Sequence, residues 1–170
     1  MLIERKQISS NECMLFLSEP LPVLGTFFVN KTTQSSTELL QNIYATQLAD
    51  TILLTSDFLY IKSNSNDNLS ELEIISLAEI DDFSLKSNQL NAPISNTAEK
   101  IEIILKTIIA PFLQKDGGDV RLAQYQDGIV YVNFLGKCHG CPYATRTLKE
   151  RVEKNLVRYL PEIKEVKLIW

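Results

Sequence analysis

The chain has 170 residues, of which 45% are hydrophobic and 22% are charged, the composition of a soluble globular protein with one ordinary domain or two small ones. Its net charge of −4 is unevenly divided: residues 1–96 hold five Lys and Arg against twelve Asp and Glu, whereas residues 97–170 hold twelve against nine. This division predicts two units with different surfaces. The small basic excess, without interleaved aromatic residues, argues against a nucleic-acid partner. The longest apolar stretch, Ile101 to Leu113, is broken by Glu102 and Lys106, which excludes a transmembrane helix and predicts no membrane partner.

The first half of the chain, residues 1–84, predicts a small α+β domain that contains no clustered chemistry. Leu39, Leu40, Ile43, Tyr44 and Leu48 recur at helical spacing in the first of its two helices. The predicted elements are strands at Cys13–Leu17 and Thr26–Asn30, a helix at Ser35–Asp50, a hairpin of Thr51–Thr55 with Phe58–Lys62, and an acidic helix at Leu69–Phe83. Residues 85–96 are polar and aperiodic and contain Pro93, so they are predicted to form a linker.

The second half, residues 97–170, predicts the order helix, strand, strand, helix, strand. Asp127-Gly128 is a strong signal for a two-residue hairpin turn between the first two strands. The predicted elements are a helix with Thr97 as its N-cap, a turn at Asp116–Asp119, strands at Val120–Gln126 and Ile129–Leu135, a helix from Ala144 to Leu160 ended by Pro161, and a strand at Ile163–Trp170. We therefore expect an α+β fold of two small domains, the second with a three-stranded sheet covered on one face by two helices.

Cys138-His139-Gly140-Cys141-Pro142 is the strongest chemical signal in the sequence. Two cysteines separated by two residues can face one metal centre, and a following helix start favours the thiolate form. Thiolates bind iron or zinc and also attack disulfides. Cys138 and Cys141 are therefore candidate metal, cluster or redox residues.

Three interpretations of this pair stay open on the residues alone. A structural zinc site needs four ligands, but there is no second cysteine pair, and His139 cannot easily close on the same ion as both cysteines. A thiol–disulfide oxidoreductase would use the same motif, although its fold normally needs a larger parallel sheet. In the third, two chains each supply Cys138 and Cys141, and together they give the four thiolates of an iron–sulfur cluster.

Other conspicuous residues favour structural roles. The glycines of Asp116-Gly117-Gly118-Asp119 suit a tight turn from helix to strand better than they suit a metal loop. We expect His139 to be an exposed loop residue and Cys13 to be a buried apolar one. Because three cysteines are an odd number, a secreted disulfide framework is disfavoured. Met1 to Lys6 resembles neither a signal peptide nor a transit peptide, and the cytoplasm is the expected compartment.

The motifs of the second half resemble the C-terminal domain of the NifU/Nfu iron–sulfur scaffold proteins. The resemblance covers about Ala98 to Trp170. It is carried by Asp116-Gly117-Gly118-Asp119-Val120, Asp127-Gly128, Gly136-x-Cys138-x-Gly140-Cys141-Pro142 and Thr147-Leu148-Lys149. The first half is more weakly similar to the domain that precedes it in Nfu proteins, through Val23-Leu24-Gly25-Thr26 and Asp57-Phe58-Leu59-Tyr60-Ile61.

This resemblance implies a carrier rather than an enzyme. It would hold a [4Fe-4S] cluster between two subunits through Cys138 and Cys141, as a homodimer when loaded. Its expected partners are upstream cluster-assembly machinery, which supplies the cluster, and apo iron–sulfur client proteins, which receive it. Basic residues early in the following helix, Arg146 and Lys149, are expected to offset the negative charge of a cluster with four thiolates.

Overall fold

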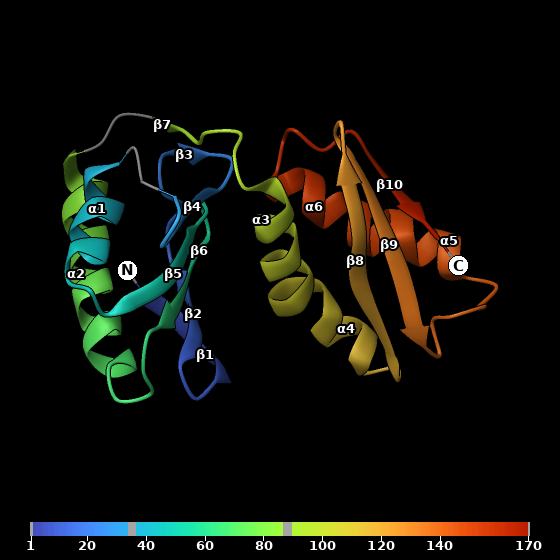
Figure 1. The fold of residues 1–170 in the computed structure, drawn as a ribbon, viewed down its shortest axis with the longest axis horizontal. Coiled ribbons are helices and arrows are strands. Elements are labelled where there is room, and N and C mark those ends of the chain that lie inside the picture. The colour runs from blue at the N-terminus through green and yellow to red at the C-terminus, as the bar shows by residue number, and fades with distance from the viewer. Residues whose placement is uncertain (1, 34–36, 87–89, 170) are drawn as a thin grey trace. The chain divides into compact units, whose positions relative to one another are not determined.

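The computed structural model describes residues 2–33, 37–86 and 90–169, and the chain divides between Pro93 and Ile94 into two compact units (Figure 1). Each unit combines helices with a sheet, so the predicted α+β class is confirmed. Over the residues described, none of the helices has the length and apolar character needed to cross a membrane.

The first unit is built on a five-stranded antiparallel sheet with the order β1-β2-β6-β5-β4. Its strands are β1 (Leu2–Ser9), β2 (Glu12–Leu17), β4 (Phe27–Asn30), β5 (Ala49–Leu54) and β6 (Phe58–Ser63). The hairpin of β5 and β6 is confirmed. β1 was not predicted, because it is an edge strand in which Glu4, Arg5 and Lys6 interrupt the apolar alternation that identifies a strand.

Two helices, α1 (Glu38–Ala45) and α2 (Leu69–Lys86), lie together on one face of this sheet (Figure 1). Leu39, Leu40 and Ile43 of α1 are buried in the core between helices and sheet. The predicted extension of α1 to Asp50 is wrong: Gln47 has a φ of 62°, which ends the helix, and the chain then enters β5. The predicted start at Ser35 lies outside the described residues.

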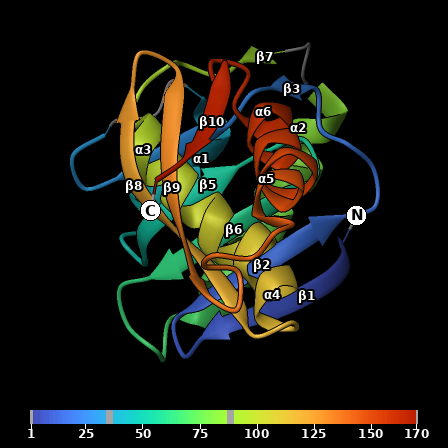
Figure 2. The same cartoon turned by 90° about the vertical axis from the view of Figure 1, so that its right-hand side faces the viewer.

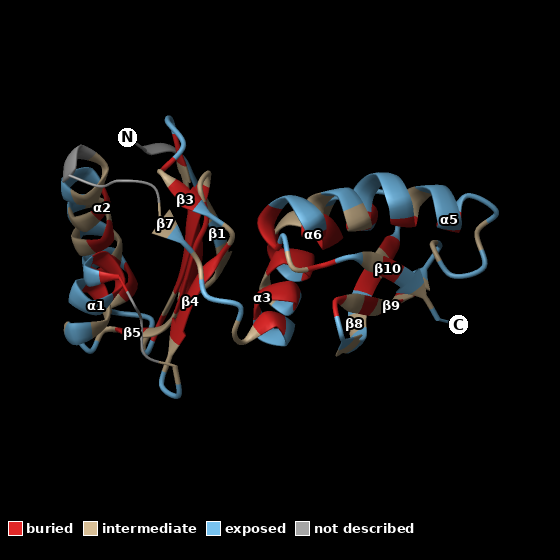
Figure 3. Cartoon of the chain, turned by 90° about the horizontal axis from the view of Figure 1, so that it is seen from above, coloured by how far each residue is buried: buried red, intermediate tan, exposed pale blue. Residues whose placement is uncertain are grey.

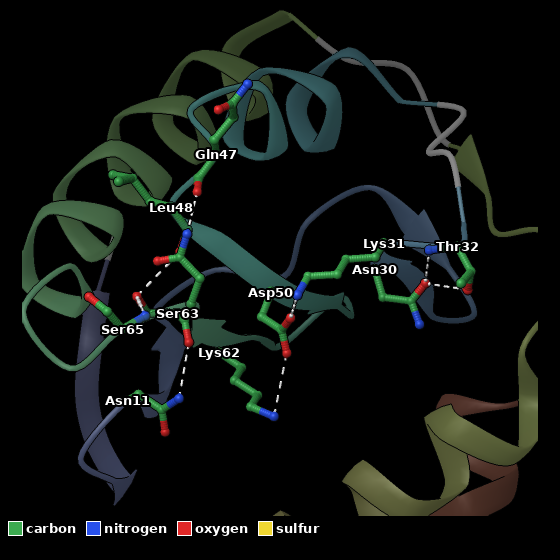
Figure 4. A network of polar contacts seen from close by, with 11 residues as sticks. Asn11, Asn30, Lys31, Thr32, Gln47, Leu48, Asp50, Lys62, Ser63 and Ser65 are labelled. Carbon is green, nitrogen blue, oxygen red and sulfur yellow. Dashed lines mark hydrogen bonds and ion pairs between the residues drawn. The ribbon is translucent and has the colours of Figure 1, made fainter.

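Polar contacts join the strands of the first unit at their ends (Figure 4). The side-chain amide of Asn11 donates to the backbone carbonyl of Ser63 over 3.0 Å. Asp50 on β5 pairs with Lys31 over 3.2 Å and with Lys62 on β6 over 3.4 Å. These contacts link strand ends of the first unit, and none of them assembles a reactive group.

The predicted linker, residues 85–96, belongs in part to the first unit. Leu85 and Lys86 end α2, and β7 (Leu90–Asn91) pairs in parallel with β3 (Val23–Leu24). Residues 87–89 lie outside the description. Two-residue strands are too short to show a periodic pattern, so the sequence gives no signal for this pairing.

The second unit contains the three-stranded sheet that the sequence predicts. Its strands β8 (Gly118–Gln126), β9 (Ile129–Gly136) and β10 (Glu165–Leu168) follow the order β10-β9-β8. β8 and β9 are antiparallel, and β9 and β10 are parallel. Asp127 and Gly128 have φ values of 52° and 85°, as expected of the predicted hairpin turn. The buried residues of β9 are Val130, Val132 and Phe134, which alternate with partly exposed ones, so one face of the sheet is covered.

Two long helical segments provide that cover (Figures 2 and 3). The first is α3 (Thr97–Ile104), a π-helical turn η1 (Leu105–Ile109) and α4 (Ala110–Gln114); the second is α5 (Ala144–Thr147), η2 (Leu148–Glu153) and α6 (Lys154–Tyr159). The predicted stripe of Leu148, Val152, Leu156 and Tyr159 is buried. The predicted N-cap is wrong: Asn96, in a left-handed conformation, occupies the N-cap position of α3 without a side-chain capping hydrogen bond, and the Thr97 hydroxyl donates to the Glu162 carboxylate over 3.2 Å.

Candidate functional site

The loop between β9 and α5 contains Cys138 and Cys141, and Figure 3 shows it as mostly exposed. The Cys138 N–H donates to the Leu135 carbonyl over 3.3 Å as β9 ends, and the Cys141 N–H donates to the Cys138 carbonyl over 3.5 Å. Gly140 has a φ of 70°, a value that favours glycine, between the two cysteines. Both thiols are partly exposed and line one groove, so the loop brings the two predicted residues together at the surface.

The first cysteine is held against the turn that precedes β8. The Lys137 N–H donates to the Gly117 carbonyl over 3.0 Å, and Gly118 pairs with Gly136 at the end of the hairpin. A Cβ atom on Gly118 would lie 2.1 Å from Cys138 Sγ, far inside van der Waals contact. Gly118 therefore leaves the space that the Cys138 sulfur occupies.

The Asp116–Asp119 segment was predicted only as a turn, and its contact with Cys138 was not predicted. The turn itself is present, since Gly117 has a φ of 79°. No sequence pattern could have identified the role of Gly118, because it depends on the register that sets β8 beside the end of β9.

The two thiols have different electrostatic surroundings. Burial, the neighbouring Cys141 and the carboxylates of Asp116 and Asp119 all raise the pKa of Cys138. The Cys141 sulfur instead accepts a hydrogen bond from the Tyr143 N–H over 3.4 Å. The expectation that a helix start would favour the thiolate is therefore wrong for Cys138, because its pKa is raised and α5 begins only at Ala144.

A groove of about 650 Å³ adjoins both cysteines and is formed entirely by the second unit. Four cationic side chains line it, Lys115, Lys137, Arg146 and Arg151, against the two carboxylates of Asp116 and Glu150. Phe112 and Tyr143 add two aromatic rings, which are 51% and 69% exposed. We call this surface the basic groove.

Arg146 and Lys149, which were predicted to offset the charge of a bound cluster, each form an ion pair with a carboxylate of the same helical segment. Arg146 pairs with Glu150 over 2.9 Å, and Lys149 pairs with Glu153 over 2.7 Å. Lys149 does not line the basic groove, whereas Lys137, which adjoins Cys138 in the sequence, does. Lys137 is thus better placed than Lys149 to act on a charge held by the thiols.

The remaining candidate ligands considered from the sequence are Cys13 and His139. Cys13 is fully buried in β2 of the first unit, as predicted, and His139 is exposed on the loop. Within residues 2–33, 37–86 and 90–169, no group of three or more His, Cys, Asp or Glu side chains gathers in a way that could hold a metal ion. One chain therefore offers a pair of thiols at this loop, which is half the donor set of a four-coordinate zinc ion or of an iron–sulfur cluster.

Residues 101–167, which include this loop, match the NifU-like domain. The chain as a whole is 29% identical to the protein named NFU1 iron-sulfur cluster scaffold homolog, mitochondrial, from Drosophila sechellia, across 100% of this chain and 65% of that relative. It is also 27% and 26% identical to the NifU-like proteins 5 and 4, mitochondrial, from Arabidopsis thaliana, covering 94% and 90% of this chain and 65% and 60% of the relatives. The resemblance to the NifU/Nfu proteins is thereby confirmed, and the chain spans just under two thirds of the length of these relatives.

The same relatives correct the expected compartment. Their names place them in mitochondria, which contradicts the cytoplasmic expectation for this chain. That expectation rested on three cysteines without a disulfide framework and on the composition of the first six residues. Free thiols require only a reducing environment, so they do not distinguish the cytoplasm from other reducing compartments.

Proposed function

We propose that this protein is an iron–sulfur cluster carrier that binds a [4Fe-4S] cluster between two copies of the chain through Cys138 and Cys141. The observation that carries this proposal is a pair of thiols on one exposed loop, with no further metal-binding group gathered beside them among the described residues. Two copies related by a twofold axis would supply four thiolates, the set that such a cluster requires. The NifU-like domain and the scaffold names of the relatives support this function.

In this proposal the cluster is cargo, and its transfer to an apo-protein is an exchange of ligands. A thiolate of the recipient forms a bond to an iron atom as the bond from Cys138 or Cys141 breaks. The recipient thiol loses a proton and the carrier thiol gains one, so no oxidant or reductant is needed. The proposed partners are cluster-assembly machinery upstream and apo iron–sulfur proteins downstream, and the role is carriage rather than catalysis.

Anaerobic reconstitution with iron and sulfide tests this function. The wild-type chain should gain iron, acid-labile sulfide and a visible absorption band, and it should elute as a dimer in gel filtration. Cys138→Ala and Cys141→Ala should each abolish loading, because each substitution removes two of the four ligands in a dimer. Cys13→Ser is the matched control and should load like the wild type, since Cys13 lies buried in the other unit.

A second measurement separates carriage from the other functions of a thiol pair. The loaded protein should activate an apo-enzyme that needs a four-iron cluster even when a chelator scavenges free iron. Activation that the chelator blocks completely would reduce the protein to an iron store. A chain that never retains iron but reduces disulfides catalytically would instead be a thiol–disulfide oxidoreductase, and one that dimerises with zinc alone would be a zinc-bridged interaction module.

A further inference from the structure

The basic groove carries charge that its own carboxylates do not neutralise. Arg146 pairs with Glu150, which leaves Lys115, Lys137 and Arg151 with Asp116 as the remaining carboxylate of the lining. Within the described chain, these three cations make no ion pair. An occupant of this surface should therefore carry negative charge.

The groove also offers an apolar contact between its cations. The Lys115 ammonium lies 5.5 Å from the centre of the Phe112 ring, and the Arg151 guanidinium lies 6.0 Å from it. These cation–π contacts hold both charges beside a ring that is 51% exposed. A simple anion would use the cations and leave the ring exposed, whereas an acidic peptide with one apolar side chain would use both. Aromatic and Arg side chains are also the residues that contribute most to binding at protein interfaces.

The position of the groove suits a cluster recipient. Cys138 and Cys141 form part of the groove lining together with Phe112 and Arg151. Direct exchange of thiolates requires the recipient's cysteines to reach these two sulfurs, so a recipient segment held in the groove would keep its own cysteines close to them. We propose that the basic groove is the docking site for an acidic segment, with an apolar anchor, of the apo-protein that receives the cluster. This inference rests on the proposed carrier function.

In the proposed dimer a second copy meets this one at Cys138 and Cys141, but it fits the cationic and aromatic part of the groove less well. A twofold contact would place the same surface on both sides, so the unneutralised cations of one groove would face those of the other. Like charges at such a contact repel each other. An acidic recipient meets the opposite situation, and the second copy is kept as an outcome of the test.

The test compares full-length variants that make the same change of charge in different places. Arg151→Glu reverses a charge inside the groove, and Lys154→Glu reverses an exposed charge on the same helical segment outside it. Phe112→Ala removes the apolar contact. The probe is a fluorescein-labelled twelve-residue peptide of Glu, Asp and Ser around one Leu, and its binding to the apo chain is measured by fluorescence anisotropy. Circular dichroism verifies that each variant is folded.

We expect Arg151→Glu and Phe112→Ala each to weaken peptide binding by about tenfold or more, the range of a lost interface anchor. The Lys154→Glu control should stay within about twofold, and raising the salt concentration should weaken wild-type binding. After reconstitution, the two groove variants should contain as much iron as the wild type and should transfer clusters to an acidic apo-ferredoxin more slowly. A peptide that binds wild type and Arg151→Glu equally, or does not bind at low salt, overturns the inference.

The remaining outcomes are also decisive. If Arg151→Glu loses iron or elutes as a monomer after reconstitution, the groove belongs to the contact between two copies and the docking inference fails. If the wild type itself retains no iron, the carrier function fails. The peptide measurement on the apo chain still decides whether the groove binds acidic segments.

Discussion

The two units place their cysteines in opposite environments, one buried and the other partly exposed. Cys13 lies in a central region of the first sheet, fully buried, where desolvation and a hydrogen bond to Glu73 raise the pKa of its thiol. Cys138 and Cys141 lie on a loop of the second unit, partly exposed beside a groove. The element that carries a cysteine, rather than the residue type, therefore decides whether its sulfur packs or reacts.

The largest effect on cluster loading is expected at Gly118, which leaves room for the Cys138 sulfur. Gly118→Val should abolish most cluster loading, because its Cβ would collide with Cys138 Sγ and rotate that sulfur away from Cys141. Iron and sulfide analysis after reconstitution measures the loss. Gly140→Asn is the matched control: nothing lies within 4 Å of its Cβ, and Asn tolerates the positive φ of this position. Full loading of Gly118→Val would show that the Cys138 position is not set by Gly118.

The comparison between the cysteines can be measured directly by alkylation. In the native apo chain, iodoacetamide should modify Cys138 and Cys141 and spare Cys13, which should react more slowly by a factor on the order of 100 or more because it needs local unfolding to become accessible. Cys138 should react more slowly near neutral pH than an unperturbed thiol and accelerate as the pH rises, since its raised pKa keeps it protonated. Mass spectrometry of peptides distinguishes the three sites, and equal rates for all of them would contradict the structural contrast.

The next effect concerns the stability of the first unit. Arg5 donates to both carboxylate oxygens of Glu73, at 2.6 to 2.9 Å, and joins β1 to α2. Burial acts to raise the pKa of Glu73, but hydrogen bonds from Arg5 and Cys13 outweigh it and lower the pKa below its usual value. Because the folded pKa is below the unfolded one, the resulting stability is present above about pH 4.3 and is lost as the pH falls through the folded value.

Glu73→Gln should therefore lower the free energy of unfolding of the first unit by about 1–3 kcal/mol at pH 7. Its deficit relative to the wild type should shrink in acid, where the wild-type carboxylate is itself protonated. Asp81→Asn, at an exposed position of the same helix, should leave stability unchanged. Urea titrations at pH 7 and pH 3.5 measure these differences, and a deficit that stays constant with pH would refute the assigned role of Glu73.

The smallest effect is expected at the edge of the second sheet. Glu153 accepts a hydrogen bond from the Val166 N–H of β10 over 2.9 Å as well as its ion pair with Lys149. Glu153→Ala should destabilise the chain by about 0.5–1.5 kcal/mol, the net value of a typical hydrogen bond. Lys149→Met removes only an exposed ion pair and should produce no measurable change in urea unfolding. If the two variants behave alike, the bond to β10 contributes nothing.

Much of the second unit could be predicted because its signals are local. The Asp127-Gly128 turn, the alternation along β9 and the stripe that includes Leu148 and Val152 each act within a few residues, and each is observed. In the first unit, β1 and the β3–β7 pairing were missed, since charged side chains or short length hide their periodicity. The predicted end of α1 was also wrong, because Gln47 takes a positive φ although it is not a glycine.

In the candidate site, too, the local features could be predicted and the contacts between distant residues could not. The cysteine pair could be identified from its spacing, and the fold places both sulfurs at one groove. The contact of Gly118 with Cys138 and the gathering of Phe112 with Arg151 join residues far apart in the chain, so no local pattern contains them. The raised pKa of Cys138 could not be predicted because it depends on the burial of its sulfur and on the carboxylates of Asp116 and Asp119, which the fold brings near it.

The register of the β8–β9 hairpin determines which residue lies beside the cysteine loop. The turn at Asp127 and Gly128 sets the pairing beside it, and a register shift between Leu122 and Gln124 changes that pairing by one residue. Beyond the shift, Gly118 lies opposite Gly136 and Val120 opposite Phe134. A slip of one residue would bring Gly117 or Asp119 to the place of Gly118 and would turn Val120 away from the core. Hence the apolar packing that selects the register also selects the residue beside the Cys138 sulfur, and a mutation in a distant turn could disable the loop without touching it.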